Sequence, residues 1–260
     1  EETGLSRWEQ ETARRALREG RPQIGLWQAL ANAYTAELCA GAGYDWLLFD
    51  GEHAPNTIQT LLAQLQAVKA YPVEAVARPP VGDPVLIKQY LDIGFRSLLI
   101  PMVESAAQAK MLVAATRFPP HGMRGVASAT SRASSFGVNA KYLENTHADI
   151  CLVVQIESAA GLSAIEDIAP IEGVDGLFIG PGDLAGGLGH LGNSTHPDVV
   201  SAISEALTRI RSAGKAAGIF ATSADAAGRY IQAGASFVSI GTDTGLLFNG
   251  ASDLRKSVKL

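Results

Sequence analysis

The sequence predicts a (β/α)8 barrel, a closed ring of eight parallel strands in which each strand is followed by a helix. Short apolar runs alternate with polar turns and helical stretches along the chain, and eight such runs can be found. The length of 260 residues fits a fold that typically needs about 250. No linker, charge run or low-complexity stretch divides the chain, so we expect one domain over residues 1–260. A doubly wound open sheet is the alternative.

The candidate strands are near-continuous runs of apolar and β-branched residues, as expected for parallel strands that are buried on both faces. They are Ile24–Trp27, Tyr44–Phe49, Glu74–Arg78, Ser97–Pro101, Ile150–Ile156, Gly176–Gly180, Ala216–Phe220 and Phe237–Gly241. Helix starts between them are marked by N-cap residues. Asp83 precedes a proline, and Ser105 with Gln108 fits a capping box.

The two ends of the chain and two long connections depart from this regular pattern. An additional helix is expected over Ser6–Glu19, before the first strand. At the other end, Thr242–Asn249 is short for a last helix and Asp253–Leu260 is polar, so we expect a segment from a neighbouring subunit to close the barrel. The longest segments expected to be irregular are Phe118–Gly137 and Pro181–His196; the second follows a strand directly.

Composition excludes several classes of function. A net charge of −5 with scattered Lys and Arg argues against a nucleic-acid partner. Cys39 and Cys151 lie in unrelated contexts, so neither a disulfide framework nor a zinc cluster is expected. No stretch is long and apolar enough to cross a membrane, and the first residues are charged. We therefore expect a cytoplasmic enzyme that acts on small molecules.

Two carboxylates follow neighbouring candidate strands. Glu157 ends the apolar run that begins at Cys151, and Asp183 comes shortly after the run Gly176–Gly180. Because a barrel places its chemistry at the carboxyl ends of its strands, these two acids are candidates for holding one hard divalent cation. The alternative is that Glu157 caps a helix and Asp183 lies in a turn.

An arginine and a histidine are expected at the same mouth. Arg78 ends an otherwise apolar strand, where it either forms a salt bridge with Asp50 or Glu52 or binds a carboxylate or enolate oxygen with its planar guanidinium. His53 is the one histidine near a strand end, and it is either a structural residue or a proton-transfer group.

Two other chemistries are disfavoured by position. The glycines at 187, 189 and 192 match a dinucleotide-binding fingerprint, but they lie well past their strand. A Schiff-base mechanism needs a lysine at a strand's carboxyl end, and none of the seven lysines occupies one. The remaining set of two acids, an arginine and a histidine suits one metal ion acting as Lewis acid on a 2-oxo acid, with an enolate shielded by Arg78.

Five motifs together are specific for one family. They are Gly20–Trp27, Trp46–Asn56, Ala115–Pro120, Val154–Glu157 and Phe178–Leu184. With them the sequence resembles the class II pyruvate aldolases of the HpcH/HpaI family, and the resemblance runs from about Gly20 to Asn249. It implies a (β/α)8 barrel, a homohexamer built as a dimer of trimers with the last helix exchanged between subunits, and reversible cleavage of 4-hydroxy-2-oxo acids to pyruvate and an aldehyde. The implied cofactor is Mg²⁺, Mn²⁺ or Co²⁺.

The resemblance also assigns roles to individual residues. Glu157 and Asp183 match the metal ligands, Arg78 matches the arginine that stabilises the pyruvate enolate, and His53 matches the acid–base histidine. Gln155, two residues before Glu157 on the same strand face, is expected to orient substrate or a metal-bound water.

Four further positions are implied in the same way. The amides of Gly182 and Asp183 match the donors to the pyruvate carboxylate, with Gly182 in place of the usual alanine. Asp92 matches the aspartate paired with the histidine, but it precedes the fourth strand, so we expect it to act across a subunit contact. Phe220 stands where a smaller aliphatic residue is expected, and with Val126 it is expected to line the aldehyde pocket.

Two alternatives remain from the sequence. The related citrate-lyase-β and malyl-thioester lyases would need a basic groove for a coenzyme, whereas Arg124 and Arg132 stand isolated. A non-catalytic barrel that binds a metal–oxo-acid complex is the alternative from a different class. The sequence selects neither the aldehyde nor the metal.

Overall fold

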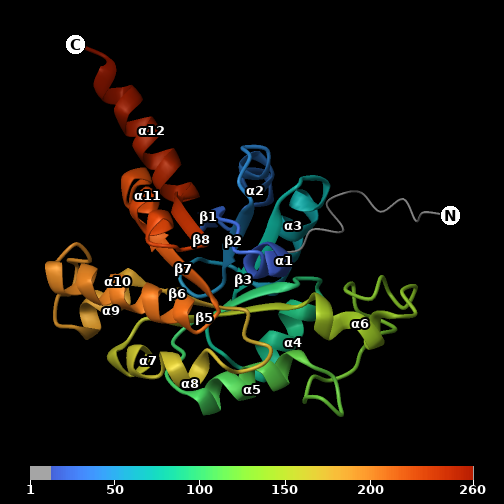
Figure 1. The fold of residues 1–260 in the computed structure, drawn as a ribbon. Coiled ribbons are helices and arrows are strands. Elements are labelled where there is room, and N and C mark those ends of the chain that lie inside the picture. Colours follow the sequence, from blue (N-terminus) through green and yellow to red (C-terminus); the bar gives the residue numbers. More distant parts are fainter. Residues whose placement is uncertain (1–12, 260) are drawn as a thin grey trace.

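A closed barrel of eight parallel strands forms the centre of the molecule (Figure 1). The computed structural model describes residues 13–259. The strands are β1 Gln23–Gln28, β2 Trp46–Asp50, β3 Glu74–Arg78, β4 Ser97–Ile100, β5 Cys151–Ile156, β6 Gly176–Ile179, β7 Ala216–Ala221 and β8 Phe237–Thr242. Each strand pairs in parallel with its neighbours in sequence, and β8 pairs with β1. The predicted fold class is confirmed, and each strand lies within a few residues of its expected bounds.

Helices surround this ring. They are α1 Ala13–Arg18, α2 Ala33–Ala40, α3 Ile58–Ala67 with the short 3₁₀ turn Val68–Ala70, α4 Pro84–Asp92, α5 Ala106–Thr116, α6 Tyr142–Asp149, α7 Ala159–Ser163, α8 Ile165–Ile168, α9 Pro181–Gly187, α10 Pro197–Ser212, α11 Ala224–Gln232 and α12 Asp243–Ser257. None of the helices among residues 13–259 is long and apolar enough to cross a membrane.

The predicted caps form, with one correction. The Asp83 carboxylate accepts the first free N–H groups of α4, and the Ser105 hydroxyl accepts the N–H of Gln108 at the start of α5. The Gln108 side chain, however, accepts the backbone N–H of Glu104 rather than that of Ser105. The capping box is therefore only half formed, because its second hydrogen bond reaches one residue further back.

One expectation about regular structure is wrong, one lies partly outside the described residues, and one helix was not expected. The first seven residues of the helix expected over Ser6–Glu19 lie outside the described residues, and the described part is α1. Pro181–His196 is not irregular throughout, because Pro181 starts α9 directly after β6. The sequence also gave no sign of α6, whose eight residues carry little apolar periodicity.

The C-terminal helix differs most from what the sequence predicts. Thr242 caps a helix of fifteen residues, so the expectation that this end is too short for a last helix is wrong. Helix α12 projects away from the barrel (Figure 1), and of its residues Asp243 alone is buried. Its exposed apolar side chains are Leu246, Leu247, Phe248 and Leu254, and the exposed Val258 follows its last residue. The predicted exchange of this helix between subunits stays a prediction.

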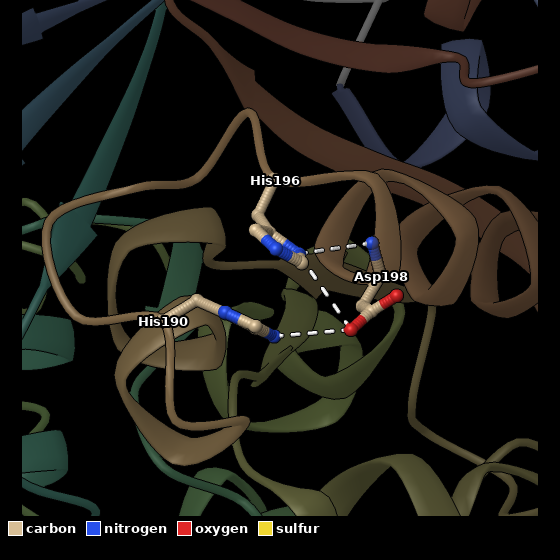
Figure 2. A group of neighbouring side chains, drawn as sticks. All are labelled: His190, His196 and Asp198. Atoms are coloured by element: carbon tan, nitrogen blue, oxygen red, sulfur yellow. Dashed lines mark hydrogen bonds and ion pairs between the residues drawn. The ribbon is translucent and has the colours of Figure 1, made fainter.

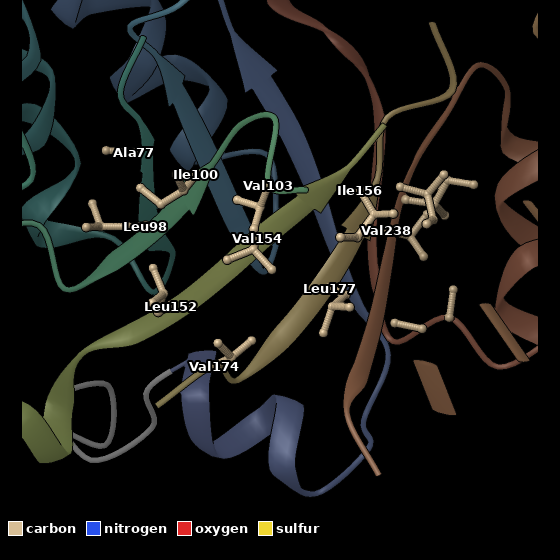
Figure 3. Close-up of a cluster of buried hydrophobic side chains, with 14 of the residues drawn as sticks. Ala77, Leu98, Ile100, Val103, Leu152, Val154, Ile156, Val174, Leu177 and Val238 are labelled. Atoms are coloured by element: carbon tan, nitrogen blue, oxygen red, sulfur yellow. The ribbon is translucent and has the colours of Figure 1, made fainter. Parts of the chain in front are cut away.

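Two apolar clusters stabilise the fold. The larger lies between the strands and their helices and includes Leu98, Ile100 and Val154 of β4 and β5 (Figure 3). The smaller fills the inside of the ring with the following residues: Leu17, Trp27, Trp46, Leu48, Val76, Leu99, Cys151, Val153, Phe178 and Phe237. The interior of the barrel is thus a packed core and not a pore, which confines polar chemistry to its ends.

Glycines make room for the large rings inside the barrel. A Cβ on Gly25 would overlap the Trp46 ring, which stacks on Phe237 at 4.1 Å between centroids. A Cβ on Gly218 would overlap Phe178 in the same way. Large and small side chains therefore alternate around the ring, and the positions of the glycines are set by this packing.

Replacing Gly25 by alanine should destabilise the protein by about 1–3 kcal/mol, because the added methyl has no space beside Trp46. Gly228, inside α11, is the control, since a Cβ there meets nothing within 4 Å and alanine favours a helix. Thermal or urea unfolding should show a lowered midpoint for Gly25→Ala and an equal or raised one for Gly228→Ala. Equal midpoints for Gly25→Ala and the wild type would contradict this description of the core.

Candidate active site at the barrel mouth

A buried ion pair lies where the packed interior meets the mouth. Arg78, the last residue of β3, donates from Nε to Asp50 Oδ1 at 3.0 Å and from Nη2 to Asp50 Oδ2 at 2.7 Å. Asp50 ends the paired strand β2 directly opposite, so strand register brings the two side chains together. The guanidinium lies 4.9 Å from the centroid of the Trp27 ring, whose indole N–H donates to Asp50 Oδ2 at 3.1 Å. The orientation of Arg78 is therefore fixed from two sides.

The third nitrogen of Arg78 faces the rest of the mouth. Nη1 lies 2.9 Å from Glu52 Oε2 and donates to Gln155 Oε1 at 3.3 Å. The salt bridges to Asp50 and Glu52 that the sequence left open both form. Because Asp50 holds Nε and Nη2 on one side, an oxygen of a substrate would meet this guanidinium at Nη1, where it would displace Glu52 or Gln155.

Gln155 connects the arginine with the predicted cation ligand. Its amide nitrogen donates to Glu157 Oε2 at 3.0 Å while its oxygen accepts from Arg78. The other Glu157 oxygen accepts the backbone N–H of Met102 at 2.9 Å. A Cβ on Gly180 would overlap the Glu157 carboxylate, so the glycine after β6 allows this side chain to lie across the strand end. A hydrogen-bonded chain thus runs from Asp50 through Arg78 and Gln155 to Glu157.

The environment of Glu157 suits a cation. The residue is 4% exposed, and burial raises the pKa of its carboxyl to about 7. The hydrogen bond from Met102 opposes this rise in pKa, while the nearby charges of Asp183 and Glu52 add to it. A buried carboxylate near a second carboxylate is destabilised in its charged form unless a positive charge lies between them. Glu157 and Asp183 are therefore the residues that fit a hard divalent cation.

Asp183 and Gly182 lie in the first turn of α9, at the same mouth. The first N–H groups of a helix have no partner within it, and their positive end favours an anion such as a carboxylate. A Cβ on Gly182 would meet nothing within 4 Å, so the alanine usual at this position would fit equally well. The glycine therefore changes neither the course of the backbone nor the space in front of it.

His53 and Glu52 occupy the loop after β2. The backbone N–H groups of both residues donate to Asp50 Oδ1, at 3.3 and 2.9 Å. The His53 side chain is 66% exposed, and its Nε2 lies 3.7 Å from Glu52 Oε2. Burial raises the pKa of Glu52, with the neighbouring Asp50 and Asp183 charges adding to it and Arg78 and His53 opposing it. The structure thus brings His53 to the mouth and leaves its ring open to solvent.

Phe220 lies at the top of the inner layer. Its ring meets that of Trp27 edge to face, with 5.4 Å between centroids, and Trp27 in turn lies against Arg78. Phe220 is half-buried on β7, so part of its ring remains open toward the mouth. Its predicted role in lining the substrate site stays a prediction that this position favours.

The structure does not bring Asp92 or Val126 to this mouth. Asp92 ends α4, which runs back toward the opposite end of the barrel from the carboxyl ends of the strands. It accepts a 2.7 Å hydrogen bond from Arg124, and Val126 lies exposed on the following loop. Both residues can serve a catalytic site only in another copy of the chain.

Arg124 and Arg132, which the sequence shows as isolated from any basic groove, are engaged in contacts within the fold. The Arg124 side chain is fully buried, paired with Asp92 and the Tyr142 hydroxyl, and its guanidinium lies 4.6 Å from the centroid of the Phe118 ring. Arg132 donates to the carbonyl of Ile93. Neither contributes to a groove for a phosphorylated coenzyme.

Sequence reasoning missed two neighbours of the site: Trp27, which orients Arg78 together with Asp50, and Met102, which donates to Glu157. The salt bridge of Asp50 to Arg78 is one of the alternatives that the sequence left open. The alternation of side chains along β2 places Asp50 on the inner face with Leu48 and Trp46, and this pattern predicts that Asp50 points toward the site. The Met102 contact depends on the course of a loop and left no signal in the sequence.

Comparisons with known proteins agree with this geometry. A family model described as HpcH/HpaI aldolase/citrate lyase matches residues 23–250. The hydroxypyruvate/pyruvate aldolase of Deinococcus radiodurans is 57% identical over 248 residues, which are 95% of this chain and 90% of that protein. The 4-hydroxy-2-oxo-heptane-1,7-dioate aldolase of Salmonella dublin is 53% identical over 92% of this chain and 91% of its own.

Solved structures agree as well. A family protein from Burkholderia cenocepacia J2315, described as an HpcH/HpaI aldolase/citrate lyase family member, superposes with a TM-score of 0.91 at 42% identity, covering 94% of this chain and 97% of that one. Barrel, acidic mouth and relatives together define an aldolase, a carbon–carbon lyase. The chain belongs to the HpcH/HpaI aldolase/citrate lyase family.

The raised pKa of Glu157 predicts how the stability of cation-free protein depends on pH. Between the ordinary value of 4.5 and about 7 the folded state retains a proton that the unfolded chain has lost, so the free energy of unfolding should fall as pH rises through this window. The fall attributable to Glu157 should be about 3 kcal/mol. It is measured as the difference between wild type and Glu157→Gln in urea unfolding with chelator at about pH 4.5 and about pH 7.5. An identical pH dependence in the two proteins would show that Glu157 is not perturbed.

Proposed function

We propose that this aldolase reversibly cleaves 4-hydroxy-2-oxo acids to pyruvate and an aldehyde with the help of one divalent cation, Mg²⁺, Mn²⁺ or Co²⁺. The observation that carries the proposal is the hydrogen-bonded chain from Asp50 through Arg78 and Gln155 to Glu157, with Asp183 beside its end. Relatives named for aldolase activity on pyruvate, hydroxypyruvate and 4-hydroxy-2-oxo-heptane-1,7-dioate support the substrate class.

Glu157 and Asp183 would hold the cation. Both offer hard oxygen ligands, and two carboxylates with water suit all three metals equally. When bound, the cation supplies Lewis-acid polarisation of the 2-oxo group of the substrate.

The chain's own residues bind and orient the substrate. The free N–H groups at Gly182 and Asp183 are placed for the carboxylate of the 2-oxo acid. Arg78 Nη1 stabilises the negative charge that develops on the 2-oxo oxygen when the C3–C4 bond breaks, and its position is held by Asp50. Because Arg78 is already oriented, this stabilisation needs no rearrangement of the side chain at the moment of reaction.

Proton transfer at the 4-hydroxyl falls to His53, directly or through a water. Its exposed ring lies at the mouth but has only Glu52 near it in its own chain. Asp92, held by Arg124 at the other end of the barrel, would complete a histidine–aspartate pair from a neighbouring subunit. This arrangement requires an oligomer, for which we propose a hexamer built as a dimer of trimers, and the exposed apolar residues of α12 favour exchange of that helix.

The aldehyde partner would lie beyond the 4-hydroxyl, toward Phe220 of the same chain and Val126 of a neighbouring one. Phe220 already contacts Trp27, so a bulky aldehyde has to compete with this ring for space. Thioester lyase activity is less well supported, because Arg124 and Arg132 are committed to contacts within the fold.

Arg78→Ala should abolish exchange of the pyruvate methyl protons with solvent, because the negative charge of the enolate loses its stabilising guanidinium. Removing one such donor typically lowers rates by about 10²–10³-fold. The measurement is loss of the methyl signal in deuterated buffer by NMR, with Gly182→Ala as a control that should exchange at close to the wild-type rate. Chelator should stop exchange in the wild type, and readdition of Mn²⁺ should restore it. Normal exchange in Arg78→Ala would assign Arg78 a different role.

Mixing two inactive variants tests the shared site. If His53 of one chain works with Asp92 of another, His53→Ala and Asp92→Ala homo-oligomers should each be impaired. Hybrids formed by refolding the two together should regain activity, because some of their sites contain both native residues. The condensation of pyruvate with a simple aldehyde is the assay. Hybrids no more active than their parents would place both residues within one chain or exclude Asp92.

A further inference from the structure

Two histidines and an aspartate gather outside the barrel mouth, where α9 leads into α10. His190 lies in the connecting loop, His196 caps α10, and Asp198 lies in its first turn (Figure 2). His190 Nε2 is 3.2 Å from Asp198 Oδ2, and His196 Nδ1 is 3.6 Å from the same oxygen. Among residues 13–259 this is the only group of three or more His, Cys, Asp and Glu side chains whose ligand atoms all lie within 4.8 Å of one another.

These separations match the edges of a metal coordination shell. Bonds of about 2.0–2.1 Å in tetrahedral geometry place neighbouring ligand atoms roughly 3.4 Å apart. The two measured edges, 3.2 and 3.6 Å, lie on either side of that value. The third edge, between the two imidazole nitrogens, is within 4.8 Å. An ion beside Asp198 Oδ2 could therefore contact all three side chains once the two imidazoles rotate out of their stacked arrangement.

The side chains that would have to rotate contact one another and are partly exposed. The two rings stack with 3.6 Å between centroids and 14° between their planes, so they must move apart before a nitrogen of each can ligate one ion. The imidazoles are 24% and 32% exposed and Asp198 is 71% exposed, so solvent reaches all three side chains. His196 Nδ1 now accepts the Asp198 backbone N–H at 3.2 Å, and a metal would take that lone pair. The released N–H belongs to the exposed first turn of α10, where water can replace the lost acceptor.

We propose that His190, His196 and Asp198 form a second cation site, selective for a late first-row divalent ion such as Zn²⁺, Ni²⁺ or Cu²⁺. Two imidazoles and one carboxylate favour these ions over Mg²⁺, whereas the mouth offers only the oxygens of Glu157 and Asp183. The two sites therefore differ in ligand chemistry as well as in position.

Binding at this site would join three segments. The His190 backbone N–H donates to the Ala185 carbonyl of α9 at 2.7 Å, so the loop carrying His190 is already attached to the helix that carries Asp183. An ion shared with His196 and Asp198 would tie this loop to the start of α10 as well. The site would thus link α9, which carries Asp183, to the start of α10. It takes no part in the reaction itself.

The test distinguishes the two sites by first removing the candidate cation ligands at the mouth. Chelator-treated full-length Glu157→Gln/Asp183→Asn protein is titrated with Zn²⁺ by calorimetry at neutral pH. One Zn²⁺ should bind per chain. Adding His190→Ala should weaken binding by at least about 10–100-fold, the loss seen even for partners outside the first coordination shell. His121→Ala, which removes an exposed histidine elsewhere, is the matched control and should bind as the parent does.

A spectroscopic measurement identifies the ligands in otherwise wild-type protein. The electron paramagnetic resonance spectrum of bound Cu²⁺ should show coupling to two imidazole nitrogens, lost or reduced in His190→Ala and retained in His53→Ala. Aldolase activity with Mg²⁺ should be unchanged in His190→Ala. Zn²⁺ binding of equal affinity with and without His190, or absent from the parent, would overturn the proposal and leave the assignment of the mouth untouched.

Discussion

The bidentate ion pair between Arg78 and Asp50 forms the boundary between the apolar interior of this barrel and its polar mouth. Below it, Trp27 closes the packed inner layer and donates to the same aspartate. Above it, the remaining guanidinium nitrogen reaches Gln155 and, through it, Glu157. A buried arginine without its carboxylate would cost about 3–5 kcal/mol, so structure and site depend on one contact. A charged group can remain at this depth and still reach the mouth because Asp50 offsets its desolvation.

The other carboxylates at the mouth, unlike Asp50, are not each matched by a positive charge. Arg78 has a surplus of carboxylates near it, since Glu52, Glu157 and Asp183 all lie within electrostatic reach of one another. Burial and mutual repulsion raise the pKa of both Glu52 and Glu157, which is the electrostatic condition that a divalent cation relieves. The mouth therefore balances one fixed positive charge against several negative ones.

The barrel was predictable from the sequence because each strand is a local signal: a short apolar run followed by a polar turn and a helix cap such as Asp83. Glu157, Arg78 and His53 were predictable as site candidates for the same reason, since polar residues at the ends of apolar strands converge in this fold. The contact of Met102 with Glu157 and the burial of Arg124 depend on loop paths, which no periodic pattern encodes. Helix α12 was underestimated because its apolar residues do not face their own barrel. Asp92 and Val126 lie away from the mouth of their own barrel, so their expected roles in the site stay predictions.

A crystal structure of the protein grown with Mn²⁺ and pyruvate would test the central claim most directly, through anomalous scattering from the metal. We predict an anomalous peak within ligand distance, about 2.0–2.3 Å, of carboxylate oxygens of both Glu157 and Asp183. The 2-oxo oxygen of pyruvate should lie between that peak and Arg78 Nη1. A peak that contacts neither carboxylate, or pyruvate bound away from Arg78, would contradict the account.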